Sequence, residues 1–128
     1  MNTSVICWFE IYTEDIERAK KFYSSVLGVE FYHMPAIDDD VIMAAFSSPE
    51  NMQDVSGALV QVKGASVNTK SCPSTIVYFP CINCSEEEGR VEKAGGKIVT
   101  SKMSIGEHGF CSICIDSEGN TFGLHSME

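Results

Sequence analysis

The sequence has little basic charge, few prolines and no long apolar run. Nine Lys and Arg stand against 18 Asp and Glu, which gives a formal net charge of −9 in 128 residues. A phosphate backbone repels such a chain unless its basic residues cluster, and acidic residues flank the nearest approach to a cluster, Lys20 and Lys21. No apolar run reaches the roughly 18 residues of a membrane span. We therefore expect neither nucleic acid nor membrane as a partner.

The remaining composition is typical of a globular protein. Hydrophobic residues make up 44% of the chain and charged residues 21%, which excludes a disordered or fibrous protein. The length favours a single domain whose core needs no disulfides. No basic residue precedes the first apolar stretch, so we expect no secretory signal and a cytoplasmic protein.

The six cysteines permit two interpretations. Cys81 and Cys84, and then Cys111 and Cys114, have the spacing of zinc-ribbon halves, and a zinc-stabilised interaction module is one candidate function. However, Cys111 and Cys114 fall in an expected strand, where residues three apart point to opposite faces. We therefore favour reduced thiols, with the paired cysteines filling the core as small hydrophobic side chains.

The first half of the chain predicts a strand, a helix and three further strands. Residues 5–12 are apolar and β-prone apart from Glu10. Either Thr13 or Asp15 can cap the helix, and Gly28 can end it. The three later strands are expected at 29–33, 41–46 and 58–62. The packing face of the helix is predicted from residues at helical spacing, namely Ile16, Ala19, Phe22, Tyr23, Val26 and Leu27.

The second half repeats this order of elements. After a strand at 74–79, a capping box at 85–88 predicts a helix that ends at Ala94. Three strands follow at 97–100, 110–115 and 121–126, with a turn at 116–120 between the last two. An offset of 68 residues aligns the halves, for example Asp15 with Asn83 and Gly28 with Gly96.

Duplicated units of this kind bury their faces together. We predict an α+β fold of two βαβββ modules, residues 4–62 and 74–127, joined by a linker at 63–73. Neither module is expected to hold a good core alone, so residues 4–127 are predicted to form one domain.

Residues 5–28 resemble the opening of the glyoxalase/bleomycin-resistance/dioxygenase family, also called the vicinal oxygen chelate superfamily. Its first helix follows the pattern D-x-x-R-A/S-x-x-F-Y-x-x-V/L-L-G. Residues 94–98 and 116–122 resemble the second module of the same family, and residues 105–110 and 123–126 resemble an uncharacterised bacterial branch. The residues that fit the helix pattern are Asp15, Arg18, Ala19, Phe22, Tyr23, Leu27 and Gly28.

The resemblance implies curved mixed sheets that enclose a cavity for a small molecule, with the helices outside, and it implies a homodimer. Family enzymes, among them lyases, isomerases and dioxygenases, use a divalent metal ion as a Lewis acid. Other members bind drugs without a metal. Here the usual ligand positions correspond to Trp8, Ile76 and Gly123, and to Gly57 or its neighbours. Because these side chains cannot ligate, no cofactor is firmly implied.

Strand alternation gives candidate residues near those positions. Glu10 and Tyr12 share a face with Trp8, Tyr78 shares one with Ile76, and His125 shares one with Gly123. The leading prediction is a glyoxalase-like protein that binds a small organic molecule through Trp8, Glu10, Tyr12, Tyr78, His108 and His125.

Glu10 and His125 would act as acid and base if chemistry occurs. The alternative is a metal-dependent lyase or isomerase, similar to lactoylglutathione lyase, with Glu10 and His125 as relocated ligands and His108 as a third. Purely structural roles remain open, with Trp8 and Tyr78 filling the core and Glu10 paired or at a sheet edge.

Overall fold

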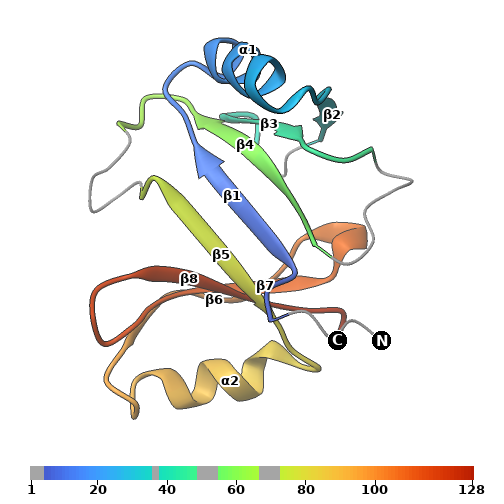
Figure 1. The fold of residues 1–128 in the computed structure, drawn as a ribbon. Coiled ribbons are helices and arrows are strands. Elements are labelled where there is room, and N and C mark those ends of the chain that lie inside the picture. Colours follow the sequence, from blue (N-terminus) through green and yellow to red (C-terminus); the bar gives the residue numbers. More distant parts are fainter. Residues whose placement is uncertain (1–4, 36–37, 49–54, 67–72) are drawn as a thin grey trace. The chain divides into compact units, whose positions relative to one another are not determined.

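The computed structural model describes residues 5–35, 38–48, 55–66 and 73–128. Contacts divide the chain into two compact units. We call Trp8–Thr75 the N-terminal module, and residues 76–128 with residues 5–7 the C-terminal module. Each contains one helix and four strands in the order βαβββ, so the predicted repeat is confirmed (Figure 1). Neither helix of the described chain is long and apolar enough to cross a membrane.

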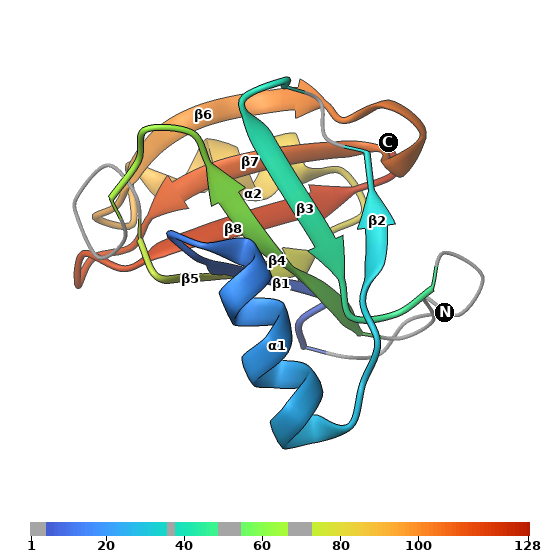
Figure 2. The same ribbon diagram turned by 90° about the horizontal axis from the view of Figure 1, so that it is seen from above.

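The N-terminal module is a four-stranded mixed sheet with one helix on it. Its strands lie in the order β2-β3-β4-β1, with β1 parallel to β4 and the other neighbours antiparallel. Helix α1 covers one face through contacts with β3 and β4 (Figure 2). Ile16, Ala44 and Leu59 form the core beneath it. The elements are β1 (Trp8–Tyr12), α1 (Ile16–Leu27), β2 (Tyr32–Met34), β3 (Val41–Ala45) and β4 (Ser56–Val62).

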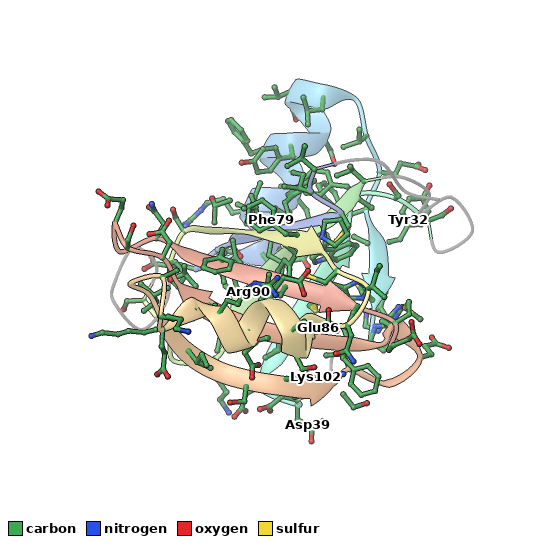
Figure 3. The ribbon with its side chains drawn as sticks, turned by 90° about the horizontal axis from the view of Figure 1, so that it is seen from below. Tyr32, Asp39, Phe79, Glu86, Arg90 and Lys102 are labelled. Carbon is green, nitrogen blue, oxygen red and sulfur yellow. The ribbon has the colours of Figure 1, made fainter. Side chains whose placement is uncertain are left out.

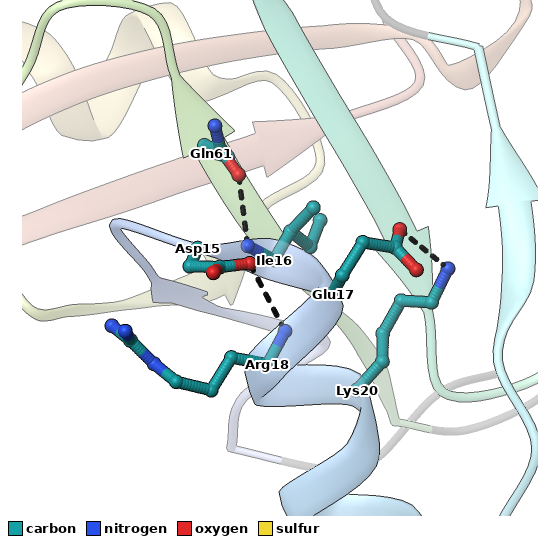
Figure 4. A network of polar contacts seen from close by, with 6 residues as sticks. All are labelled: Asp15, Ile16, Glu17, Arg18, Lys20 and Gln61. Atoms are coloured by element: carbon teal, nitrogen blue, oxygen red, sulfur yellow. Dashed lines mark hydrogen bonds and ion pairs between the residues drawn. The ribbon is translucent and has the colours of Figure 1, made fainter.

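Local chemistry explains both ends of α1. The Asp15 carboxylate accepts a hydrogen bond from the Arg18 backbone N–H at 3.1 Å, so Asp15 and not Thr13 is the N-cap. The Gln61 side-chain oxygen accepts from the Ile16 N–H at 2.8 Å and ties the helix to β4 (Figure 4). Gly28 ends the helix at φ 69°, a left-handed conformation that glycine adopts without a Cβ penalty.

Two expectations for this segment were wrong. Phe22, Val26 and Leu27 are 58%, 62% and 57% exposed, because α1 meets the sheet along a narrower stripe than the apolar pattern predicts. The strand expected at 29–33 pairs with β3 only from Tyr32 to Met34. Phe31 instead packs on the Phe46 ring, with centroids 4.8 Å apart.

The C-terminal module repeats the arrangement, with strands in the order β5-β8-β7-β6 and β5 parallel to β8. Helix α2 covers one face through contacts with β6, β7 and β8 (Figure 1). Cys84, Cys114 and Leu124 form the core beneath it. The elements are β5 (Thr75–Pro80), α2 (Cys84–Val91), β6 (Lys97–Ser104), the 3-10 turn η2 (Gly106–His108), β7 (Phe110–Ile115) and β8 (Thr121–Ser126).

The predicted capping box at 85–88 is wrong. Asn83 caps α2 by accepting a hydrogen bond from the Ser85 N–H at 3.1 Å, and the helix ends at Val91. Glu88, the presumed partner of Ser85, accepts from the Lys102 backbone N–H on β6 at 2.6 Å. The Lys102 ammonium donates to Asn83 at 2.9 Å, so β6 fixes this end of the helix. Figure 3 labels Lys102 together with Glu86 and Arg90 of α2.

Most of the linker expected at 63–73, including Cys72, lies outside the described residues. The turn at 116–120 is described and is held by the Asp116 carboxylate, which accepts from the backbone N–H groups of Glu118 and Asn120 at 2.8 and 2.9 Å.

Candidate functional site

The strongest candidate site is on β1, on the face of the N-terminal sheet that α1 does not cover, which we call its helix-free face. Trp8, Glu10 and Tyr12 alternate with Phe9 and Ile11, and Ile11 packs against the core under α1. Glu10 is 9% exposed. Each of its carboxylate oxygens accepts a hydrogen bond from a neighbouring aromatic side chain, Trp8 Nε1 at 3.2 Å and Tyr12 Oη at 2.7 Å.

This arrangement holds a carboxylate in a fixed orientation. An unpaired buried carboxylate costs several kcal/mol, and hydrogen bonds to the charged form offset part of that cost. Trp8 and Tyr12, two residues before and after Glu10, supply these bonds from the same strand. Glu10 is therefore oriented by neighbours on its own strand, and it presents an oriented acceptor group.

The neighbouring strands supply small and apolar side chains beside Glu10. The pairing register sets Ser56 opposite Trp8, Ala58 opposite Glu10 and Val60 opposite Tyr12. Ala45 of β3 lies opposite Ala58, and both alanines are fully or almost fully buried. Glu10 is thus a single carboxylate in a mainly apolar patch.

The C-terminal module places the other predicted residues on its own helix-free face. Tyr78 of β5 lies opposite Gly123 of β8, and a Cβ at Gly123 would overlap the Tyr78 ring. Ile76 and Tyr78 are both buried, at 5% and 8% exposure. The Tyr78 ring therefore occupies the space into which a side chain at position 123 would project.

The His125 side chain contacts the backbone of His108 and not its side chain. His125 Nε2 lies 2.6 Å from the backbone oxygen of His108, so this nitrogen carries a proton and donates. The lone pair of the imidazole is then on Nδ1. The His108 side chain is half exposed, and its Nε2 lies 3.9 Å from a Glu107 carboxylate oxygen. Turn η2 thus orients His125 through the main chain.

The residues at the family's usual metal positions do not fit a metal ion. Trp8 Nε1 donates to Glu10 and has no lone pair for a metal, and Ile76 has no ligating atom. At Gly123 the Tyr78 ring fills the space of a ligand side chain. Gly57 has its Cβ direction blocked by the Phe9 ring, with ring atoms at 2.5 Å. Within the described ranges no three His, Cys, Asp or Glu side chains are grouped to hold a metal.

The five described cysteines belong to the C-terminal module, and no three of them are grouped to hold a metal ion. Cys114 and Cys84 are fully buried under α2, whereas Cys111 pairs with His125 on the opposite face of β7. Burial and the nearby Glu87 carboxylate raise the pKa of the Cys81 thiol to about 12. Burial also raises the pKa of Cys114 and of Cys7. Thiols of this kind are poor nucleophiles at neutral pH.

An open cleft of about 400 Å³ lies at the start of α1. Among the predicted site residues it includes Tyr12 but neither Trp8 nor Glu10. Its walls carry the opposing charges of Glu14, Asp15 and Arg18, and no arrangement there selects one sign of ligand. The lining residues are Ile11, Tyr12, Thr13, Glu14, Asp15, Arg18, Ala19, Phe22 and Tyr23.

Comparison with known proteins bears on the fold and on its first segment. Residues 6–43 match the model of a family described as bleomycin resistance protein-like, N-terminal. A hypothetical protein from Bacillus halodurans C-125 superposes with a TM-score of 0.69 at 9% identity, over 96% of this chain and 94% of that chain. None of the curated proteins compared with the chain matches it.

Two methylmalonyl-CoA epimerases have similar structures. The enzyme from Mycobacterium tuberculosis gives a TM-score of 0.66 at 13% identity, over 100% of this chain and 93% of that chain. A variant of the Streptomyces coelicolor enzyme, in complex with 2-nitronate-propionyl-CoA, gives 0.65 at 11% identity over 96% of each chain.

The duplicated βαβββ order and these structures define the vicinal oxygen chelate fold. The matched N-terminal segment is in addition similar to the bleomycin resistance protein-like family, over residues 6–43 of this chain.

Two features of the site were not predicted from the sequence. Ser56 falls two residues before the strand that was expected at 58–62, so its place on the helix-free face was missed. The aromatic rings over Gly57 and Gly123 were also missed. The signal was present, since each glycine lies in a β-prone segment, where glycine indicates close approach of another group.

Proposed function

We propose that the protein binds a small organic molecule on the helix-free face of the N-terminal sheet, with Glu10 as its oriented acceptor. One observation carries the proposal: the nearly buried Glu10 carboxylate is held at both oxygens by Trp8 and Tyr12 on a mainly apolar patch. Sites for small molecules commonly combine an apolar lining with a few placed polar groups.

The chemistry of the patch restricts the ligand. Glu10 complements an N–H or O–H donor, and a ligand carboxylate would be repelled by it and by the net charge of −9. Trp8 and Tyr12 offer aromatic surface to an apolar ligand body. The ligand class is therefore a neutral or cationic molecule with a hydrogen-bond donor and an aromatic or aliphatic part.

On the helix-free face of the C-terminal module, Tyr78, His108 and His125 are proposed as that module's own ligand contacts. His125 accepts through Nδ1 in its neutral form, and Glu10 and His125 are the proposed acid or base residues of their respective modules if a ligand is also a substrate. A ligand bound to the Streptomyces coelicolor epimerase supports small-molecule binding as a use of this fold. A homodimer in the cytoplasm is part of the same proposal.

Trp8 provides the measurement, since it is the only tryptophan in the chain. We would titrate the protein with benzylamine, benzamide, benzyl alcohol and benzoate, which share a ring and differ in polar group. The first three are expected to change Trp8 fluorescence, and benzoate is not. Ligand-observed NMR would confirm each binding constant independently of the fluorophore.

Two matched variants test the role of Glu10. Glu10→Gln replaces a charge-assisted hydrogen bond, so its affinity for benzylamine should fall about tenfold or more. Glu14→Gln removes an exposed carboxylate four residues away and should leave that affinity unchanged. Equal losses in both variants, or benzoate binding as well as benzylamine, would contradict the proposal.

Metal analysis of protein purified without added zinc separates the two alternative functions. Metal lost on Glu10→Ala or His125→Ala would favour a lyase or isomerase with relocated ligands. Metal lost on Cys81→Ser would favour a zinc-stabilised module. The high pKa of Cys81 opposes the thiolate form that such a module requires.

A further inference from the structure

The Ser56 hydroxyl is an unexplained polar group on the same sheet face. Ser56 is 6% exposed, and its Oγ is buried without a hydrogen-bond partner. Among the described residues, the only other buried side-chain nitrogen or oxygen without a hydrogen-bond partner is Glu87 Oε1 on α2. Buried hydroxyls almost always have a partner, so this hydroxyl is a candidate contact for a group that the structure does not contain.

The strand register fixes the direction of this hydroxyl. Ser56 lies opposite Trp8, and residues opposite each other in paired strands project to the same face. Its side chain therefore projects to the face that carries Glu10. Glu10 itself lies opposite Ala58, which is two residues after Ser56 on β4. Diagonal neighbours of this kind are roughly 7–8 Å apart. Ala58 on one side of this diagonal adds only a methyl group, and Trp8 lies on the other side, so a small ligand group that spans both positions would also lie beside the indole.

We propose that Ser56 is the second polar contact of the ligand and that it selects an amide-type group. The Ser56 hydroxyl donates to the ligand's carbonyl oxygen while Glu10 accepts from the adjacent N–H. An amide or a urea presents such a donor and acceptor one atom apart, whereas an amine presents a donor alone. This inference rests on the proposed function, because it requires a ligand at Glu10.

The test compares two probes in wild type and in Ser56→Ala. Benzamide affinity should fall about three- to tenfold in Ser56→Ala, the loss of one neutral hydrogen bond. Benzylamine affinity should change less than twofold, because an amine has no acceptor for the hydroxyl. An equal change for both probes, or no change for either, would overturn the assignment of Ser56.

Ser112→Ala is the matched control. Ser112 is also buried, but its hydroxyl donates to the Thr100 backbone oxygen at 3.1 Å. Its loss should lower the thermal midpoint by a few degrees without changing the ratio of the two affinities. Ser56→Ala should leave the midpoint unchanged. A fall as large as that of Ser112→Ala would show that Ser56 is already bonded within the fold, and would overturn the inference.

The two proposals fail in different ways. If neither probe binds wild type, or if Glu10→Gln has no effect, the proposed function fails and the inference fails with it. If both probes bind and depend on Glu10 but Ser56→Ala leaves their ratio unchanged, only the role of Ser56 fails.

Discussion

The two modules have the same order of elements but differ in what their helix-free faces carry. In the N-terminal module the first strand presents Glu10 between two aromatic donors, and small residues lie opposite it. In the C-terminal module the first strand presents Tyr78, whose ring fills the space above Gly123. In a repeated fold, one half can therefore present an oriented carboxylate, whereas in the other half an aromatic ring fills the space beside a glycine.

The difference does not extend to the cores beneath the helices. Each core depends on one buried leucine of the module's last strand, Leu59 at 0% and Leu124 at 5% exposure. Both contact residues of their own helix, Ile16 in one module and Cys84 in the other. In both modules, a buried leucine of the last strand thus packs the helix against the sheet.

The largest predicted effect tests that similarity. Leu59→Ala and Leu124→Ala should each lower the free energy of unfolding by about 2–5 kcal/mol, because each leaves a cavity in a packed core. Urea denaturation followed by far-UV circular dichroism measures both. If the chain is the single domain that the sequence predicts, each variant shifts one cooperative transition. Two separate transitions would show that the modules fold independently.

The next prediction concerns the glycines beneath the aromatic rings. Gly123→Ala should lower stability by about 1–3 kcal/mol, because the new Cβ overlaps the Tyr78 ring near its attachment and the strand must shift. Gly57→Ala should cost a similar amount against the Phe9 ring. In a double-mutant cycle, Gly123→Ala should lower stability less in the Tyr78→Ala background than in wild type, because the overlapping ring is gone. Additive losses of stability would contradict the contact between the two positions.

The order of elements could be predicted from periodicity, but the contacts at the site could not. Helical spacing and turn residues located both helices and most strands, and the offset of 68 residues paired Asp15 with Asn83, which cap the two helices. Local patterns failed where distant residues decide the outcome. Glu88 suggested a capping box, yet it bonds Lys102 of β6, and the rings over Gly57 and Gly123 depend on strand register.

The helix caps give a smaller test of the same comparison. Asp15→Ala should lower the free energy of unfolding by about 1 kcal/mol, the usual value of a cap. Asn83→Ala should cost more, since Asn83 also accepts from the Lys102 ammonium. Ser85→Ala, the cap that the sequence suggested, should cost less than either. Thermal unfolding measures all three, and a larger loss for Ser85→Ala than for Asn83→Ala would reverse the assignment of the cap.

The smallest effect is expected at the turn between β7 and β8. This turn distinguishes the two modules, because the position equivalent to Asp116 at the offset of 68 residues is Ser48. Hydrogen bonds from Asn120 and Glu118 lower the pKa of Asp116. A carboxyl whose pKa is lower in the folded state stabilises the fold above its unfolded pKa, and this stabilisation is lost as the pH falls through the folded pKa. Asp116→Ala should therefore be less stable than wild type at pH 7, and the difference should shrink below about pH 4. Urea denaturation at pH 7 and pH 3 measures this, and a difference that does not vary with pH would assign the loss to the turn geometry instead of the charge.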